Sequence, residues 1–465
     1  MTIEDIYQVF LAHPEVNTDS RNCPAGSMFF ALKGVSFDGN RFAAKALEDG
    51  AAVAVVDDAG VVVEGDSRYI LVDDVLATLQ QLAAYHRRQF HGPVLQVTGT
   101  NGKTTTKELL AAVLAKKFRV HYTQGNLNNH IGVPLTLLRL RTEEVAARYG
   151  SEPHEIAVIE TGANHPDEIA FLTAIADPDY GLVTNVGRAH LEGFGSFEGV
   201  KRTKGELYDY LLQKEGARLF VNESNDDLRG MLTERGAELG GGRCIGYAHS
   251  DTAPSATCIC QGEVLSCSPL LTFGWAVPGG EPHRVDTRLI GAYNVDNVLA
   301  AVAVGLHFGV RPDDISDAIS SYQPSLGRSE LRRTADNELI VDAYNANLTS
   351  MQAALENFRL LDAEQKMLIL GDMKELGDAS AKAHEQVLTT ALQSGARRIW
   401  LVGREFRKAQ EALSSRQRIP EDCRVRTFDD VEAVKTAIAE DGPTGQLILI
   451  KGSNSTRLHQ LPSLL

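Results

Sequence analysis

The sequence contains no apolar run near the roughly 18 residues that a membrane-spanning helix requires. Its opening segment, MTIEDIYQVF, has neither the basic start nor the apolar stretch of a secretory signal. Positive charge is also scarce, because 46 Lys and Arg residues stand against 61 Asp and Glu residues, a formal net charge of -15. We therefore expect a cytoplasmic protein with no membrane span and no nucleic-acid partner, in which only a locally positive site would bind an anionic nucleotide.

Cysteine is sparse as well, and its spacing argues against a structural metal site. The six cysteines stand at positions 23, 244, 258, 260, 267 and 423. A paired site would need two CxxC-like pairs, and the sequence has none. We expect the cysteines to be small buried side chains in a reducing compartment.

The order of expected elements indicates about three domains, which the length allows. Over the first 90 residues, strands are expected at 27–32, 52–57 and 69–73 and helices at 41–48 and 75–89. His91, Gly92 and Pro93 then read as a linker. No internal repeat or low-complexity tract is present.

A second unit follows this linker and has the pattern of a parallel sheet. Strands are expected at 94–98, 155–161 and 181–185, and helices at 104–117, 166–175 and 295–308. Residues 240–290 are richer in Gly, Thr, Ser and Val and suggest an antiparallel patch. The last 140 residues alternate regularly, with strands at 339–342, 367–370, 399–402, 424–428 and 447–450, which indicates a doubly wound α/β domain.

A phosphate-binding loop is indicated by TGTNGKTTT, between a buried strand and a helix. Gly99 and Gly102 would let backbone N–H groups face phosphate oxygens, and the helix N-terminus adds positive potential. Lys103 would meet the β- and γ-phosphates, and the Thr104 hydroxyl is placed to ligate magnesium. The common pattern GxxxxGK[ST] has Gly where this chain has Val97, so the assignment depends on the flanking strand and helix. The alternative is a glycine turn with a solvated lysine.

Two polar residues follow strands at the edge where this loop emerges. Glu160 ends EIAVIE, and His190 lies in NVGRAHLEGFG. The carboxyl ends of parallel strands share one edge, so both would lie near a bound triphosphate as candidate magnesium ligands, the carboxylate better suited than the imidazole. Each also has a plain alternative, Glu160 as a strand-end cap and His190 as a surface loop residue.

Other polar groups leave two interpretations open. Lys201, Arg202 and Lys204, where KRTKGELYDYLL begins a helix, bring either local positive charge or a solvated face. Asn294 and Asn297, at a helix start, could cap that helix or hydrogen-bond a base edge. Polar residues also follow the strands of the last unit: Asn345, Asp372, Arg404, Lys451, Ser453 and Ser455. Two α/β units, one with a phosphate loop, suggest ATP-driven joining across an interdomain cleft.

The motifs resemble those of the Mur ligase family in chain order: TGTNGKTTT, ETGANH, TNVGRAHLEGFG, KGE, GAYNVDN, GRSE, DAYNAN and IKGSNS. The resemblance spans essentially the whole chain. NTDSR, GSMFFALKG, GNLNNHIGVPLTLL, DAYNANLTSM and LGDMKELG are similar to the member that adds D-alanyl-D-alanine. It implies a small α/β N-terminal domain for the UDP-muramoyl substrate (1–91), a central P-loop ATPase domain with a mainly parallel sheet (92–312), and a C-terminal Rossmann-like doubly wound domain for the incoming dipeptide (313–465).

The resemblance implies a reaction that joins D-alanyl-D-alanine to UDP-N-acetylmuramoyl-tripeptide. ATP, with Mg²⁺, would phosphorylate the C-terminal carboxylate of the tripeptide. The dipeptide amine would attack the acyl phosphate, and ADP and phosphate would leave. Because an acyl phosphate hydrolyses readily, a closed, water-excluding site and domain closure during turnover are expected. We expect a monomer.

The resemblance also assigns roles to individual residues. The catalytic and metal-binding set would be Lys103, Thr104, Glu160, His190 and Lys204, the last as a carbamate that offers an oxygen ligand. ATP would be held by Gly99, Thr100, Asn101, Gly102, Lys103, Thr104 and Thr105, by Asn294 and Asn297 at the adenine, and by Arg328 and Asp342 from the third domain. The UDP-muramoyl substrate would contact Ser20, Arg21, Asn128 and Asn129, and the dipeptide side Asn345, Lys451 and Ser453.

The chain departs from the family pattern at Tyr293, Leu348 and Asn454, where many members have His, Pro and Arg. These departures concern base stacking and dipeptide contact. Two other functions stay open. One is another ligase of the superfamily, either the third-residue muramyl ligase or a folylpolyglutamate synthetase, which usually lacks GNLNN. The other is a nucleotide-binding switch that forms no amide, which would leave the polar rim of the third domain without a purpose.

Overall fold

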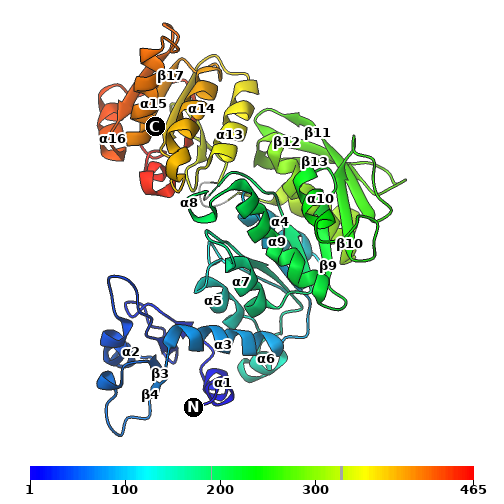
Figure 1. The fold of residues 1–465 in the computed structure, drawn as a ribbon, viewed down its shortest axis with the longest axis vertical. Coiled ribbons are helices and arrows are strands. Elements are labelled where there is room, and N and C mark those ends of the chain that lie inside the picture. The colour runs from blue at the N-terminus through cyan, green and yellow to red at the C-terminus, as the bar shows by residue number, and fades with distance from the viewer. Residues whose placement is uncertain (190, 325–327) are drawn as a thin grey trace.

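In the computed structural model, which describes residues 1–189, 191–324 and 328–465, the strands form three sheets of four, nine and six strands. Figure 1 shows these sheets with their helices following one another along the chain and along the long axis of the molecule. The expected α/β class with three domains is confirmed. Within the described residues, no helix is long and apolar enough to span a membrane.

The N-terminal domain has a parallel sheet in the order β1-β2-β3-β4. Its elements are α1 (Ile3–Ala12), β1 (Val16–Asn17), β2 (Met28–Phe30), α2 (Ala43–Glu48), β3 (Val53–Val56), β4 (Tyr69–Leu71) and α3 (Val75–Arg88). Helix α1 was not predicted from the sequence, although Thr2 and Asp5 form a capping box at its start. One hydrophobic core joins this domain to the next, because α1 and α3 bury Phe10 and Leu79 together with Leu137 and Leu172 of the central domain.

The central sheet has the order β13-β12-β11-β10-β9-β8-β5-β7-β6. Its strands are β5 (Val94–Thr98), β6 (Val120–Tyr122), β7 (Ile156–Glu160), β8 (Tyr180–Val183), β9 (Arg218–Asn222), β10 (Cys244–His249), β11 (Cys258–Cys267), β12 (Leu270–Ala276) and β13 (His283–Ile290). The strands from β6 to β11 are joined by parallel pairs. The antiparallel patch expected over 240–290 is therefore smaller, because only β11–β12 and β12–β13 pair antiparallel.

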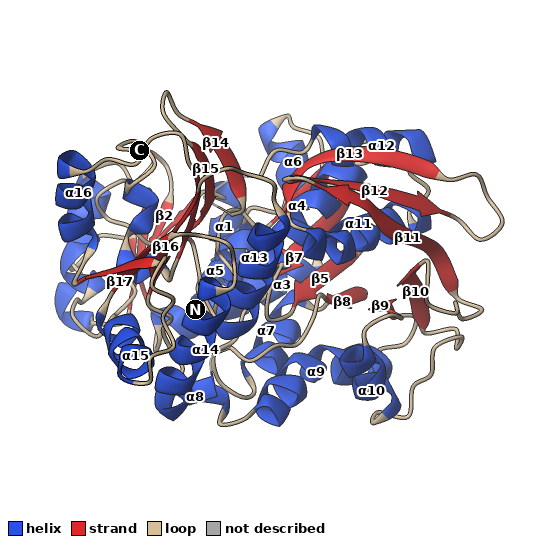
Figure 2. Ribbon diagram, turned by 90° about the horizontal axis from the view of Figure 1, so that it is seen from above, coloured by secondary structure: helices blue, strands red, loops and turns tan. Residues whose placement is uncertain are grey.

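Helices cover both faces of the central sheet, as Figure 2 shows from above. The helices of this domain are α4 (Lys103–Leu114), α5 (Gly132–Leu138), α6 (Glu143–Tyr149), α7 (Glu168–Ala176), α8 (Leu191–Phe194), α9 (Phe197–Gln213), α10 (Asp226–Thr233), α11 (Val295–His307) and α12 (Pro312–Ser321). Helix α9 begins at Phe197, earlier than expected, because Ser196 caps it. Lys201 and Lys204 consequently lie inside the helix rather than at its start.

The third domain has a sheet in the order β14-β15-β19-β16-β17-β18, parallel except for the pair β14–β15. Its elements are β14 (Glu330–Arg333), β15 (Glu338–Asp342), α13 (Leu348–Leu360), β16 (Lys366–Gly371), α14 (Ser380–Leu392), β17 (Arg398–Val402), α15 (Arg404–Ser415), β18 (Arg424–Phe428), α16 (Val431–Glu440) and β19 (Leu447–Lys451). Helices α13, α14 and α15 bury one face, including Leu355 and Phe406, and α16 buries the other, including Val434. This arrangement is the expected doubly wound sheet.

Helix α12 and the cysteines can be compared with what the sequence suggested. Helix α12 follows the expected boundary at residue 312, yet its Ile315 and Ile319 belong to the core of the central domain. The cysteines behave as expected in part: all six are free thiols, and Cys244, Cys258 and Cys260 are buried, whereas the other three are half-buried.

Candidate active site

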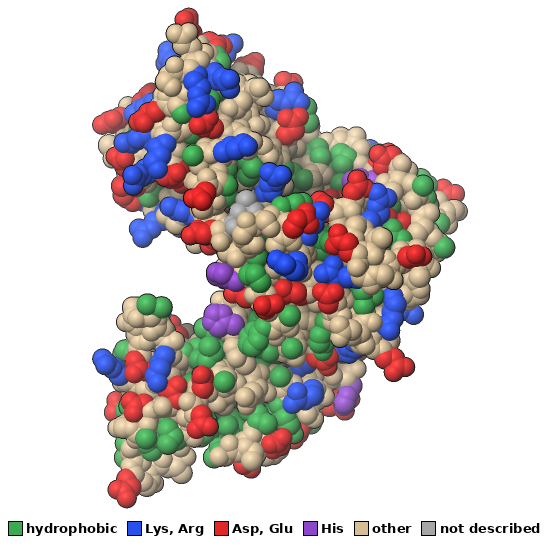
Figure 3. Space-filling view, in the orientation of Figure 1, with side chains coloured by type: hydrophobic (Ala, Val, Ile, Leu, Met, Phe, Trp, Pro, Cys, Tyr) green, Lys and Arg blue, Asp and Glu red, His purple; other side chains and the backbone are tan. Residues whose placement is uncertain are grey.

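A cavity of about 690 Å³ lies between the central and third domains. From the phosphate-loop region it is lined by Thr100, Asn101, Gly102, Lys103, Thr104, Thr105, Asn128, Asn129, Glu160 and Asn294. From the third domain and the segment leading to it, it is lined by Arg328, Asp342, Asn345 and Lys451. Figure 3 shows the molecule hollowed on the side of the central domain, between the first and third domains. The structure thus brings together most of the residues that the sequence predicted.

The glycines of the phosphate loop are required by close contacts as well as by backbone conformation. Gly99 and Gly102 have φ values of +140° and +77°. A Cβ atom on Gly99 would lie 2.1 Å from Thr184 Oγ1, and one on Gly102 would lie 2.6 Å from Asn297 Oδ1. Any larger residue would push the loop away from β8 and α11.

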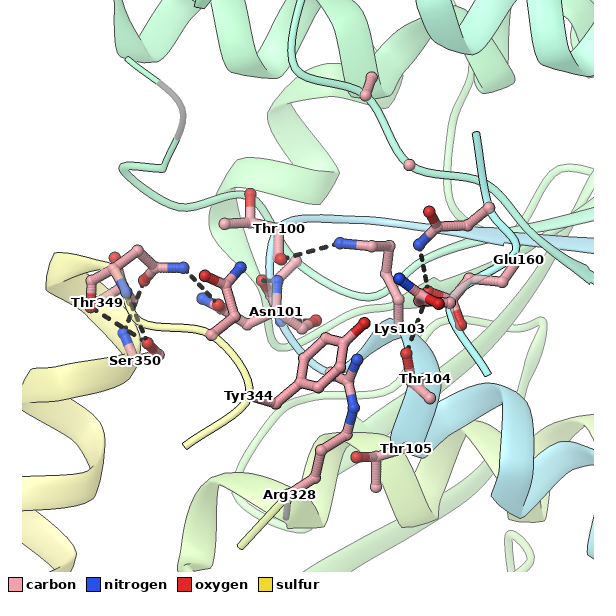
Figure 4. Close-up of a pocket in the computed structure, with 18 of the residues that line it drawn as sticks. Thr100, Asn101, Lys103, Thr104, Thr105, Glu160, Arg328, Tyr344, Thr349 and Ser350 are labelled. Atoms are coloured by element: carbon pink, nitrogen blue, oxygen red, sulfur yellow. Dashed lines mark hydrogen bonds between the residues drawn. The ribbon is translucent and has the colours of Figure 1, made fainter. Parts of the chain in front are cut away.

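Lys103 begins helix α4 and turns back over its own loop. Its ammonium donates to the carbonyl oxygens of Gly99 at 2.7 Å and Thr100 at 3.0 Å, as Figure 4 shows for Thr100. Burial lowers the pKa of Lys103 to about 8, while nearby Glu160 opposes that shift. A lysine on loop carbonyls, at the N-terminus of a helix, is placed to meet an anion entering the loop.

Glu160, at the end of β7, is the buried acid of the site. Its Oε1 accepts hydrogen bonds from Thr104 Oγ1 at 3.1 Å and Asn128 Nδ2 at 2.8 Å. Its Oε2 accepts none from the described residues, and the nearest cation is Lys107, with Nζ 3.8 Å away. A buried carboxylate oxygen without a donor, next to a threonine hydroxyl, fits a hard divalent cation such as Mg²⁺.

Lys204 lies on α9 with a buried side chain. Its Nζ is 3.5 Å from the carbonyl oxygen of Ala163, a residue that lines the cavity, so the amine lies behind the wall rather than in it. Burial, and then the charge of Lys103, lower the pKa of Lys204 to about 7. The other predicted metal ligand, His190, lies outside the described residues. Within those residues, no group of three or more His, Cys, Asp or Glu could hold a metal ion.

The two asparagines of GAYNVDN have different surroundings. Asn294 lines the cavity and makes no side-chain cap, since its Nδ2 donates to the Ile290 carbonyl at 2.9 Å. Asn297 does not line the cavity, because it accepts from Thr106 Oγ1 at 3.0 Å and donates to Asn294 Oδ1 at 2.8 Å. Asn297 therefore braces the phosphate-loop helix and orients Asn294.

The third domain contributes a charged rim. The guanidinium of Arg328 lies 4.0 Å from the centre of the Tyr344 ring, and the buried Lys451 forms an ion pair with the half-buried Asp342. Asn345 lines the cavity beside them. Ser453 is buried and does not line it, and Asp372 instead accepts from two backbone N–H groups at the start of α15.

Ser20 and Arg21 are not brought to the cavity. They belong to the N-terminal domain, and Arg21 is 87% exposed and ion-paired with Asp19. No residue of the N-terminal domain lines the cavity among those that the structure describes. The role of Ser20 and Arg21 at the UDP-muramoyl substrate therefore stays a prediction.

Several residues of the site were missed from the sequence, among them Lys107 and Asn347. Lys107 is a fully buried lysine that contacts both Glu160 and, at 3.3 Å, the carbonyl oxygen of Gly125. Asn347 donates through Nδ2 to Asn101 Oδ1 at 2.8 Å, across the two domains. Asn347 stands in DAYNAN, so the motif was the available signal, whereas Lys107 follows the loop motif without a distinguishing pattern.

Three family models match the chain: Mur ligase middle domain over residues 97–305, Mur ligase glutamate ligase domain over 327–454, and Mur ligase family catalytic domain over 15–87. UDP-N-acetylmuramoyl-tripeptide–D-alanyl-D-alanine ligases of Bacillus subtilis and Escherichia coli are 33% and 34% identical to it, each over 96% of this chain and 92% of the relative. A crystal structure of MurF from Acinetobacter baumannii is 29% identical with a TM-score of 0.81, covering 99% of this chain and 98% of that one. MurF of Thermotoga maritima in complex with ADP is 25% identical with a TM-score of 0.79, covering 98% and 97%. The chain therefore belongs to the Mur ligase family, and within it to the UDP-N-acetylmuramoyl-tripeptide–D-alanyl-D-alanine ligases.

Proposed function

We propose that this ligase joins D-alanyl-D-alanine to the C-terminal carboxylate of UDP-N-acetylmuramoyl-tripeptide, with conversion of ATP to ADP and phosphate. The product is the UDP-linked pentapeptide used in peptidoglycan synthesis, made in the cytoplasm by a monomer. One observation carries the proposal. A single cavity is lined by the phosphate loop on one side and by Arg328, Asp342, Asn345 and Lys451 on the other.

The chemistry follows from positioning and charge. The tripeptide carboxylate attacks the γ-phosphorus of ATP, and ADP leaves. The amine of D-alanyl-D-alanine then attacks the acyl carbon, and the tetrahedral intermediate collapses to the amide and phosphate. The loop N–H groups, the N-terminus of α4 and the Lys103 ammonium neutralise charge on the transferring group, as in other phosphoryl transfers. Arg328, opposite this loop, adds positive charge from the third domain.

Magnesium, when bound, would neutralise phosphate charge and fix the phosphates in line for attack. Thr104 and Glu160 would hold it, consistent with the unpaired Glu160 Oε2. Lys204 as a carbamate and His190 would complete the ligand set. Among the described residues, the buried amine of Lys204 has one weak hydrogen-bond acceptor, the Ala163 carbonyl oxygen, so the amine is available for that modification.

The remaining residues are assigned to the adenine, to the UDP-muramoyl tripeptide and to the dipeptide. Asn294 contacts the adenine, and Asn297 supports it from behind through their shared hydrogen bond. Asn128 and Asn129 serve the UDP-muramoyl tripeptide together with Ser20 and Arg21 of the N-terminal domain. Asn345, Lys451 and Ser453 serve the dipeptide side. Because α12 packs in the central core, we place the domains at 1–91, 92–322 and 323–465.

The test is phosphate release from ATP with UDP-N-acetylmuramoyl-tripeptide and D-alanyl-D-alanine, each omitted in turn. We expect release only when both are present, together with a pentapeptide product by mass spectrometry. Release with glutamate or another amine in place of the dipeptide would instead indicate a different ligase of the superfamily. Nucleotide binding without turnover under any pair would favour a nucleotide-binding switch.

A further inference from the structure

One hydrogen bond joins the phosphate loop to the third domain. Asn347 Nδ2 donates to Asn101 Oδ1 at 2.8 Å, and Figure 4 shows Asn101 facing Thr349 and Ser350 at the start of α13. The same turn of α13 lies against the loop that follows β8. A Cβ atom on Gly187 would lie 3.2 Å from Thr349 Oγ1 and 3.3 Å from the Thr100 methyl group.

The central domain holds Asn101 through its backbone. The Asn101 N–H donates to Asn185 Oδ1 at 3.0 Å. The Asn101 carbonyl oxygen accepts from Thr184 Oγ1 at 2.6 Å and Asn185 Nδ2 at 3.1 Å. The Oδ1 atom of its side chain is held by Asn347 from the other domain. The conformation of the loop residue next to Gly102 therefore depends on both domains.

Asn347 is itself fixed by helix α13. Its Oδ1 accepts from the Ser350 N–H at 2.9 Å, and its own N–H donates to Ser350 Oγ at 3.1 Å, a reciprocal capping box. With Oδ1 committed to the cap, the amide nitrogen can point only away from the helix, toward Asn101. The side chain is also buried, at 6% exposure, so it has little rotational freedom.

We propose that Asn347 is a positioning residue of the phosphate loop, which reaches its nucleotide-binding conformation only when the third domain is docked. Binding and docking then favour each other, because a contact made in one state alone couples the two equilibria reciprocally. This inference rests on the proposed function in one respect, that the loop binds a nucleotide. It does not depend on which acid and amine are joined.

The variant Asn347→Ser isolates the contact. Serine also caps helices, so α13 should keep its start, but its hydroxyl is too short to reach Asn101. We expect ADP to bind roughly three- to tenfold more weakly, the range for one lost hydrogen bond. Asn101→Ala should weaken ADP binding by a similar factor, and the double variant should lose no more than either single variant. Ser350→Ala removes the reciprocal cap but leaves the donor to Asn101, so it should bind ADP as the unmodified protein does.

The measurement is calorimetric titration with ADP alone, with small-angle scattering of each variant with and without ADP. ADP should compact the unmodified protein more than Asn347→Ser, while thermal unfolding of the two should coincide, since a purely structural role would shift unfolding instead. Unchanged ADP affinity in Asn347→Ser, additive losses in the double variant, or no ADP binding by the unmodified protein would each overturn the proposal. ADP binding without ligation would overturn the proposed reaction and leave this inference standing.

Discussion

The central domain meets its two neighbours through contacts of opposite character. Toward the N-terminal domain, α1, α3, α5 and α7 share one continuous apolar core. His86 is buried in this junction and bonds to Tyr7 and to the Leu140 carbonyl oxygen. Toward the third domain, Ile290 and Leu270 pack on that domain's core, and the contacts beside the cavity include polar pairs, such as Asn347 with Asn101 and Tyr293 with Ser329.

The difference indicates which domain can move. Separating an apolar junction exposes surface at a cost of about 25 cal/mol per Å², whereas polar contacts are replaced by water at little net cost. We infer that the first two domains form one rigid unit and that the third domain opens and closes on it. Stability should then depend on the first junction and catalysis on the second.

The largest expected effect is on catalysis, from Lys103→Ala at the polar junction. Turnover should fall by about 1000-fold or more, because a cation that neutralises the transferring phosphoryl group is lost. Stability should not fall, since the acceptors of the Lys103 ammonium among the described residues are carbonyl oxygens of its own loop. The check is phosphate release alongside urea unfolding, and near-normal turnover would remove the phosphate-loop assignment.

Lys204→Ala should come next, with turnover reduced by about 100-fold or more, since losing even an outer partner of a metal ligand costs 10- to 100-fold. Formate should restore part of the activity by supplying the missing carboxylate oxygen. The matched control is Lys201→Ala on the same helix, where the lysine pairs with Asp227 at the surface, and its activity should be near normal. Full activity of Lys204→Ala without any additive would rule out the carbamate.

Leu79→Ala tests the apolar junction. Leu79 is fully buried on α3, so its truncation should lower the free energy of unfolding by about 2–5 kcal/mol. The two tryptophans report separately, Trp275 on β12 of the central domain and Trp400 on β17 of the third. In a Trp400→Phe background, where Trp275 alone reports, Leu79→Ala should shift the urea unfolding transition to lower urea concentration. The control in the same background is Leu360→Ala, at an exposed leucine, which should leave that transition unchanged. In the opposite background, Trp275→Phe, Trp400 reports the third domain. If Leu79→Ala shifted the urea transition only there, the shared core of the first two domains would be contradicted.

The local parts of this structure could be predicted from the sequence, because strand and helix periodicity and loop glycines are set by neighbouring residues. The strands at 94–98 and 424–428 coincide with β5 and β18, and Gly99 and Gly102, the two glycines assigned to the phosphate loop, have positive φ values. Helix α1 was missed because its apolar face is filled by α3, more than 60 residues later, although its capping box was visible.

The contacts between distant segments could not be predicted. Asn101 and Asn347 lie 246 residues apart, and no local pattern shows that one amide will meet the other. Asn297 looked equivalent to Asn294, yet its amide faces Thr106 because α11 packs on α4. No sequence pattern singled out Lys107, whose surroundings, Glu160 and Gly125 around its ammonium, are set by the fold.

Acid should weaken the apolar junction by a smaller amount than Leu79→Ala. Burial lowers the pKa of His86 to about 4, below the value near 6.5 of an unfolded histidine. Between these values the unfolded chain binds more protons, so stability is complete above pH 6.5 and falls as pH decreases toward 4. The expected loss at pH 5 is roughly 2 kcal/mol for this histidine. In His86→Gln, the free energy of unfolding reported by Trp275 should depend less steeply on pH. The pH dependence reported by Trp400 should stay the same, because His384, whose pKa is also lowered by burial, remains in the third domain.

The smallest effect is expected from Tyr149→Phe, which removes one exposed hydrogen bond across the apolar junction. The Tyr149 hydroxyl on α6 donates to the Ala12 carbonyl oxygen at 2.9 Å, and the Leu11 carbonyl oxygen, 3.5 Å away, is a second acceptor of the same proton at the end of α1. Water can replace this partner, so the free energy of unfolding should drop by only about 0.5–1 kcal/mol, and ADP affinity should not change. Asn347→Ser also removes one hydrogen bond between domains, but from a junction that opens, so its loss should appear as weaker ADP binding rather than lower stability. If Tyr149→Phe weakened ADP binding as much as Asn347→Ser does, both junctions would move during binding, and the rigid pairing of the first two domains would be wrong.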